Sequence, residues 1–258
     1  MDWLHFREPV SAWTHGIWFM LAFPASLLLW RAGRGDRIKQ ISLLVFGLSL
    51  MICFGGSVLY HALRLPPQII EGWFAKADSI GIYLLIAGSI TPVAVVVLQG
   101  DWRTITLASI WLMAVGGSVL CLSPIHVPAA LSTGFYLAMG WGMILSYFQL
   151  KQNLPSRALG LAVLGGLLYS AGAVFNLLHW PVLQPGVFAA HELFHLFVMA
   201  GSLVHFWFMV TVVAPMERSV AICLIEPVAP DKTQPKSKVI FTPAAYGSNF
   251  LPRLAERR

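Results

Sequence analysis

Long apolar segments alternate with short polar or turn-forming segments along most of the chain. Seven of the apolar segments are each about long enough to cross a bilayer, which takes ~20 residues of α-helix. They cover, within a few residues, 10–30, 41–63, 79–98, 104–122, 127–147, 158–178 and 193–214. A helix is the natural structure for each one, because a segment in lipid must satisfy its backbone hydrogen bonds internally. The pattern therefore predicts an all-α membrane protein with a seven-transmembrane helix bundle.

The composition agrees with a membrane protein and excludes several other classes. Hydrophobic residues make up 57% of the chain and charged residues only 11%, whereas a soluble domain has roughly 25% charged residues. The net charge of +6 comes from basic residues in connecting segments and near the C-terminus, so we expect membrane lipids, and no nucleic acid, as partners. The three cysteines are scattered, at Cys53, Cys121 and Cys223, and predict no disulfide framework.

The composition changes after residue 214. The segment 215–258 holds six of the sixteen prolines and seven of the seventeen Lys and Arg residues. We therefore predict two parts: a transmembrane domain over 1–214 and a mostly disordered, basic C-terminal tail over 215–258.

The basic residues also predict the orientation. Seven spans place the two termini on opposite sides of the membrane. The side of the N-terminus carries Arg7, Arg64 and Lys76, and the other side carries the tail together with Arg31, Arg34, Arg37, Lys39, Arg103, Lys151, Arg157 and Arg218. By the positive-inside rule, we expect the N-terminus outside and the C-terminus in the cytoplasm, in the cell (plasma or inner) membrane.

Ionisable residues gather at the helix ends on the N-terminal side. His61 ends the second span, Asp78 begins the third, and His191 and His195 begin the seventh. Such residues are costly at membrane depth and suggest function. Residues four apart share a helix face, so His191 and His195 can point at one atom. Zn²⁺ takes nitrogen ligands readily, and His61 can supply a third if the second span packs beside the seventh. The predicted zinc site lies towards the outer face.

Two further residues are candidates for catalysis at this site. Ser57 lies one helical turn before His61 on the same face. Asp78 and Ser57 could hold a metal-bound water, whose pKa falls to ~7, or act as a general base. The simpler alternatives are that Asp78 caps the third helix and that Ser57 is a small packing residue. His205 lies deeper on the seventh span, where a structural hydrogen bond to a neighbouring helix is our preferred interpretation.

The stretch "HELFH" also matches H-E-x-x-H, the signature of zinc proteases with Glu192 as general base. The motif is short, and no later span carries an aspartate motif that would complete a membrane protease site. We therefore interpret Glu192 as a bystander and keep the protease as a minor alternative.

Three ordered stretches resemble motifs of the hemolysin III proteins within the progestin and adipoQ receptor (PAQR) family, over roughly residues 8–212. They are "EPVSAWTH" from Glu8, "SVLYHAL" with "ADSIGIYLLIAGSITP", and "HELFHLFVMAGSLVHF". The resemblance implies a seven-helix bundle with zinc on His61, His191 and His195, and with Asp78 and Ser57 near a water on that zinc. This chain departs from the pattern at Ser11, where the family usually has Asn, and at Ser79, where His is common.

The resemblance also implies a function. The family belongs to a broader group of membrane proteins proposed to be metal-dependent hydrolases, which includes alkaline ceramidases. A lipid amide or ester is therefore the expected substrate class. The alternative is a non-catalytic membrane sensor or receptor with a structural zinc, in which the fourth metal position would be closed rather than open to water.

Overall fold

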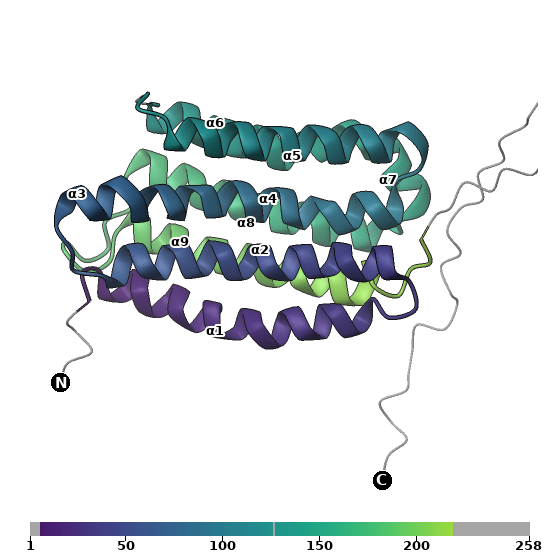
Figure 1. The fold of residues 1–258 in the computed structure, drawn as a ribbon, viewed down its shortest axis with the longest axis horizontal. Helices are drawn as coiled ribbons and strands as arrows, with labels where there is room; N and C mark the ends of the chain where they lie inside the picture. The colour runs from purple at the N-terminus through teal and green to yellow at the C-terminus, as the bar shows by residue number, and fades with distance from the viewer. Residues whose placement is uncertain (1–5, 126, 219–258) are drawn as a thin grey trace, which may run out of the picture.

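The computed structural model describes residues 6–125 and 127–218, and seven helical segments in these ranges are long and apolar enough to cross a membrane. They lie side by side as one bundle (Figure 1). The segments are α1 (Pro9–Ala32), α2 (Arg37–Ala62), Pro67–Val97, α5 (Gly100–Leu122), Ala129–Asn153, α8 (Ser156–Leu178) and Ala190–Val213. The predicted seven-helix membrane fold is confirmed. Most of the predicted tail, 219–258, lies outside the described residues.

The third span is longer than its apolar pattern predicts. It begins with α3 (Pro67–Ile69), passes through a π-helical turn (Ile70–Phe74) and continues as α4 (Ala75–Val97). Pro67 occupies the first helical position, where its fixed φ and missing N–H are no disadvantage. Asp78 therefore lies inside a continuous helix and makes no capping hydrogen bond, so the alternative that it caps the third helix is wrong.

The fifth and seventh spans also contain irregular turns. The fifth joins α6 (Ala129–Trp141) to α7 (Tyr147–Asn153) through a 3₁₀ segment, and the seventh continues α9 (Ala190–Phe208) with a π-helical turn (Met209–Val213). Because α9 starts three residues before the predicted boundary, His191 lies in its first turn.

Glycines let the helices around the site approach closely. A Cβ atom at Gly81 of α4 would lie 2.8 Å from the Cα of Cys53 on α2. On α8, Gly165 lies against His205 of α9, and Gly172 lies against Phe197. Small residues in the sixth span thus allow α8 and α9 to pack closely.

Replacing Gly81 with alanine should destabilise the bundle, because the added methyl group would meet the backbone of α2. Overpacking of this kind typically costs about 1–3 kcal/mol, so we expect a lower melting temperature in detergent. Gly116 is the matched control, since a Cβ there has no neighbour within 4 Å. A Gly81→Ala variant as stable as Gly116→Ala would contradict the close approach of α2 and α4.

Polar contacts at the opposite end of the bundle tie α2 to the last helix. Asp36 accepts hydrogen bonds from the backbone N–H groups of Ile38 and Lys39 and pairs with Arg218 Nε at 2.8 Å. Lys39 Nζ donates to the carbonyls of Ala214 and Met216, at 3.0 and 2.9 Å. These contacts tie the start of α2 to the residues that follow the seventh span.

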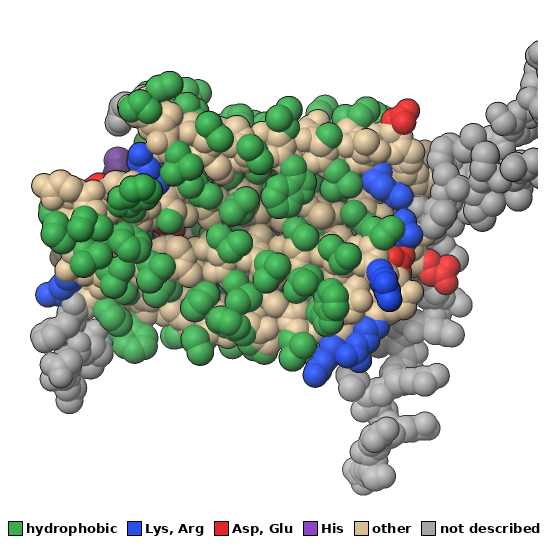
Figure 2. Space-filling view, viewed as in Figure 1, with side chains coloured by type: hydrophobic (Ala, Val, Ile, Leu, Met, Phe, Trp, Pro, Cys, Tyr) green, Lys and Arg blue, Asp and Glu red, His purple; other side chains and the backbone are tan. Residues whose placement is uncertain are grey.

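The visible flank of the bundle is covered with apolar side chains, while basic side chains gather at its ends (Figure 2).

Candidate metal centre

Three histidines from two helices converge at the end of the bundle that holds the start of α1. His61 comes from the last turn of α2, and His191 and His195 come from the start of α9. One nitrogen from each ring lies within 4.8 Å of the others. His61 and His195 are buried, at 0% and 2% exposure, and His191 is partly buried. The three side chains are therefore positioned to hold a metal ion, as the sequence predicts.

The spacing of two nitrogens and the lack of a partner for a third fit a metal ion with tetrahedral nitrogen ligands. The Nε2 atoms of His61 and His191 lie 3.4 Å apart. Two ligands at the usual Zn–N distance in a tetrahedral site lie roughly 3.3 Å from each other. Among the described residues, His195 Nδ1 is buried and has no hydrogen-bond partner. A buried polar atom normally has one, and a metal ligand bond would satisfy this nitrogen.

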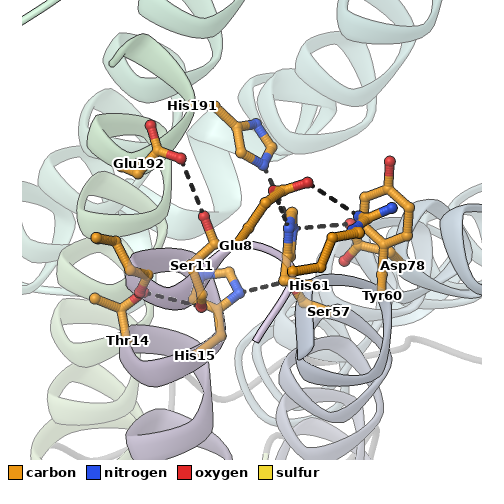
Figure 3. A network of polar contacts seen from close by, with 12 residues as sticks. Glu8, Ser11, Thr14, His15, Ser57, Tyr60, His61, Asp78, His191 and Glu192 are labelled. Atoms are coloured by element: carbon orange, nitrogen blue, oxygen red, sulfur yellow. Dashed lines mark hydrogen bonds and ion pairs between the residues drawn. The ribbon is translucent and has the colours of Figure 1, made fainter. Parts of the chain in front are cut away.

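The Nδ1 atoms of two of these rings contact polar side chains. Figure 3 shows the contact between His61 and Glu8. His61 Nδ1 lies 2.6 Å from Glu8 Oε2, and His191 Nδ1 lies 3.3 Å from Asn176 Oδ1. The hydrogen bond from His61 is the main reason that the pKa of Glu8 is lowered from its ordinary value. Metal-binding histidines commonly donate their other N–H to a carboxylate or carbonyl, which leaves the facing nitrogen free to bind the metal.

A Glu8→Gln variant should bind zinc more weakly while keeping the fold. The carboxylate orients His61 and raises the basicity of its ring, and losing such support typically lowers metal affinity about 10–100-fold. Competition with a chromogenic chelator measures this on purified protein. Glu71→Gln is the control, because Glu71 is a largely exposed carboxylate on the same end of the bundle. Equal affinities of both variants and wild type would show that Glu8 does not support the metal.

Asp78 and Ser57 lie beside the three histidines. Asp78 Oδ2 is 3.9 Å from His61 Nε2, and Ser57 lies one helical turn before His61 on the same face of α2. Ser57 Oγ is also 2.8 Å from Nδ1 of His15, whose ring stacks on His195 with centroids 3.7 Å apart. A carboxylate and a hydroxyl therefore lie beside the three histidines that are positioned to hold a metal ion.

Both carboxylate oxygens of Glu192 accept hydrogen bonds from groups other than the three histidines. Its Oε2 accepts from the backbone N–H of Ala189 at 2.8 Å, and its Oε1 accepts from Ser11 Oγ at 3.3 Å. The side chain thus closes the first turn of α9 and joins it to α1, as a capping glutamate does. His205 likewise has the structural contact that its sequence position suggests, because its Nε2 lies 3.2 Å from the carbonyl of Ala162.

A cavity of ≈470 Å³ opens above the histidines. His61, His191, Glu8, Glu192 and Tyr60 line it together with residues 186–189. At its edge, Arg7 lies 3.6 Å from Glu71 and 4.1 Å above the ring of Tyr60. Two of the three histidines, His61 and His191, therefore line a cavity at this end of the bundle.

Four further residues support the centre: Glu8, Ser11, His15 and Asn176. The sequence places Glu8 and His15 at the same end of the bundle as the three histidines, and Ser11 between them in the first family-like motif, but it assigns none of the four a chemical role. The first three recur at intervals of three and four residues, which places them on one face of the start of α1. That spacing was the available signal. Asn176 had none, because it lies near the end of an otherwise apolar helix and its role depends on how α8 packs against α9.

Comparisons with known proteins place this chain among related sequences. The family model described as "Haemolysin-III related" matches residues 4–206. The chain is 34% identical to Hemolysin-3 of Bacillus cereus over 81% of this chain and 93% of that protein. It is 26% identical to the monocyte to macrophage differentiation factor of Homo sapiens, over 78% and 82% of the two chains. It is 27% identical to the adiponectin receptor protein of Drosophila melanogaster, over 77% of this chain and 49% of that protein.

Proposed function

This chain is a multi-pass membrane protein that belongs to the haemolysin-III related family, and we propose that it hydrolyses a lipid amide or ester at a zinc ion held by His61, His191 and His195. The observation that carries the proposal is the convergence of three imidazole nitrogens beside a carboxylate, below a cavity. Zinc at such a site would supply a Lewis acid and lower the pKa of a bound water. The lipid-facing flanks of the bundle are consistent with a substrate that arrives from the membrane.

The residues around the histidines suggest a division of roles. Asp78 acts as the general base, which takes a proton from the attacking water as the oxygen bonds to the substrate carbonyl carbon. The same carboxyl group then delivers a proton to the leaving nitrogen or oxygen as the bond to that carbon breaks. Ser57 holds the Asp78 carboxylate in place, and His15 fixes the Ser57 hydroxyl through its 2.8 Å contact.

The test is hydrolysis of defined lipids by purified protein in bilayers. Wild type should cleave a ceramide-like amide or a fatty-acyl ester, and His191→Ala should lower the rate at least about 100-fold because a metal ligand is lost. Glu192→Gln should stay within about twofold of wild type, since Glu192 serves as a helix cap. Activity that survives His191→Ala would overturn the hydrolase. Activity towards peptides that depends on Glu192 would instead favour a protease.

A receptor or sensor with a structural zinc is the second candidate. The name of the Drosophila relative, adiponectin receptor protein, is the observation that favours it. The two candidates differ at the fourth metal position, which is open to water in catalytic zinc sites and closed by protein in structural ones. Substituting Co²⁺ and titrating with azide distinguishes them, because only an open position gives a spectral shift.

We also propose an orientation of the chain in the membrane. The excess of Lys and Arg on the side opposite the N-terminus favours a cytoplasmic C-terminus in the plasma or inner membrane, with the metal centre towards the outer face. A reporter fused after Arg258 that is active only outside the cytoplasm should be silent. An active reporter would reverse the orientation.

A further inference from the structure

The connection between α8 and α9, residues 179–189, is unusually apolar for a segment between two helices. From Ala158 to His191 the chain contains no Asp, Glu, Lys or Arg. Four large apolar side chains of this connection are exposed: Trp180 at 63%, Val182 at 55%, Leu183 at 65% and Val187 at 50%. Water is a poor environment for so many exposed apolar groups on one short segment.

The connection is folded into a small hairpin, which consists of residues 183–188. The backbone N–H groups of Leu183 and Gln184 donate to the carbonyl of Phe188, and those of Val187 and Phe188 donate to the carbonyl of Gln184. Gly186 occupies the left-handed region, with φ of +76°, that the turn requires. Because the hairpin satisfies these backbone groups internally, it can lie near lipid without leaving them unpaired.

We propose that this connection lies in the lipid headgroup layer, with Trp180 and the hairpin residues Leu183 and Val187 as its apolar anchors. Both flanking helices are membrane spans that end here, so the hairpin lies within a few residues of the bilayer surface. Tryptophan is enriched at this depth. The connection between α1 and α2, at the opposite end of the bundle, differs: its residues 33–36 include the charged Arg34 and Asp36, which favour water.

The hairpin lies next to the cavity of the candidate metal centre. Residues 186–189 form one wall of the cavity above His61 and His191. A hairpin seated among head groups therefore holds the mouth of that cavity at the level of the membrane surface. The contact rests on the shape and apolarity of the connection and applies equally to a hydrolase and to a receptor.

Spin-label accessibility tests the proposal in the full chain in phosphatidylcholine nanodiscs. A nitroxide is attached at Leu183→Cys after Cys53, Cys121 and Cys223 are replaced by alanine, and Arg34→Cys serves as the control at the opposite end. The label at 183 should relax with oxygen and be shielded from a water-soluble nickel complex, and the label at 34 should show the reverse. Nickel accessibility at 183 equal to that at 34 would overturn the proposal. Spin–spin broadening between labels at 183 would assign the surface to a second copy of the chain, which would also overturn it.

A second measurement avoids removal of the cysteines. Trp180→Phe in the otherwise native chain should reduce the part of the tryptophan fluorescence that lipids brominated near the head group quench. If the quenched fraction of the tryptophan fluorescence did not change, Trp180 would not lie in the headgroup layer.

Discussion

Replacement of His61 with alanine is expected to lower the affinity for zinc at least about 100-fold, so that the purified variant loses its metal at a free zinc concentration that saturates wild type. Loss of a supporting partner alone typically costs 10–100-fold, and loss of a ligand removes a metal bond as well. Equilibrium dialysis against a zinc buffer, followed by elemental analysis of monodisperse protein, measures the effect. His61 is 130 residues from His191 in the sequence, so joint dependence of the metal on both would establish their convergence in solution.

The control for this experiment is a histidine on α9 that does not belong to the three. His205→Gln replaces a ring that contacts the carbonyl of Ala162 with another hydrogen-bond donor, and it should keep the wild-type metal content. Zinc retained at the wild-type level by folded His61→Ala protein would show that the metal, if any, is held elsewhere. Equal losses in both variants would point to a general disturbance of the bundle rather than to a ligand.

The number of spans could be predicted from the sequence because lipid imposes a simple requirement. Each crossing needs about twenty apolar residues with internally satisfied backbone, and the seven segments meet it. The helix boundaries were harder to predict. Residues 64–78 fall between two predicted spans, yet Pro67 starts a helix that continues through a π-helical turn into α4. The start of the third span thus depends on the backbone geometry at Pro67, which the hydropathy of the sequence does not reveal.

The candidate site could be predicted only where spacing carries information. His191 and His195 follow from an i, i+4 pair on one helix face. His61 could be predicted as the third ligand because the number of spans places it at the same end of the bundle as His191 and His195. The hydrogen bond between Glu8 and His61, and that between Asn176 and His191, depend on side-chain positions to within a fraction of an ångström. No periodicity in the sequence fixes such positions.

An Asp78→Asn variant should keep its zinc and lose most of its hydrolytic activity. Asparagine has nearly the shape of aspartate and can still meet the Ser57 hydroxyl, but it cannot accept the proton of an attacking water. Removal of a general base typically lowers kcat about 10²–10⁴-fold. The measurement pairs single-turnover hydrolysis of the lipid substrate with zinc analysis of the same sample.

The pH profile separates this role from a structural one. In wild type, the rise of kcat/KM with pH reports the ionisation of the essential base in the free enzyme, and Asp78→Asn should lose that limb rather than shift it. Glu71→Gln, on the exposed π-helical turn of the same span, should retain both turnover and profile. Zinc loss in Asp78→Asn would make Asp78 a support of the metal centre, and full activity with zinc bound would remove it from the reaction. The 3.9 Å between Asp78 and His61 places the carboxylate close enough for either role, so only the combination of retained metal, lost turnover and altered pH dependence identifies Asp78 as the base.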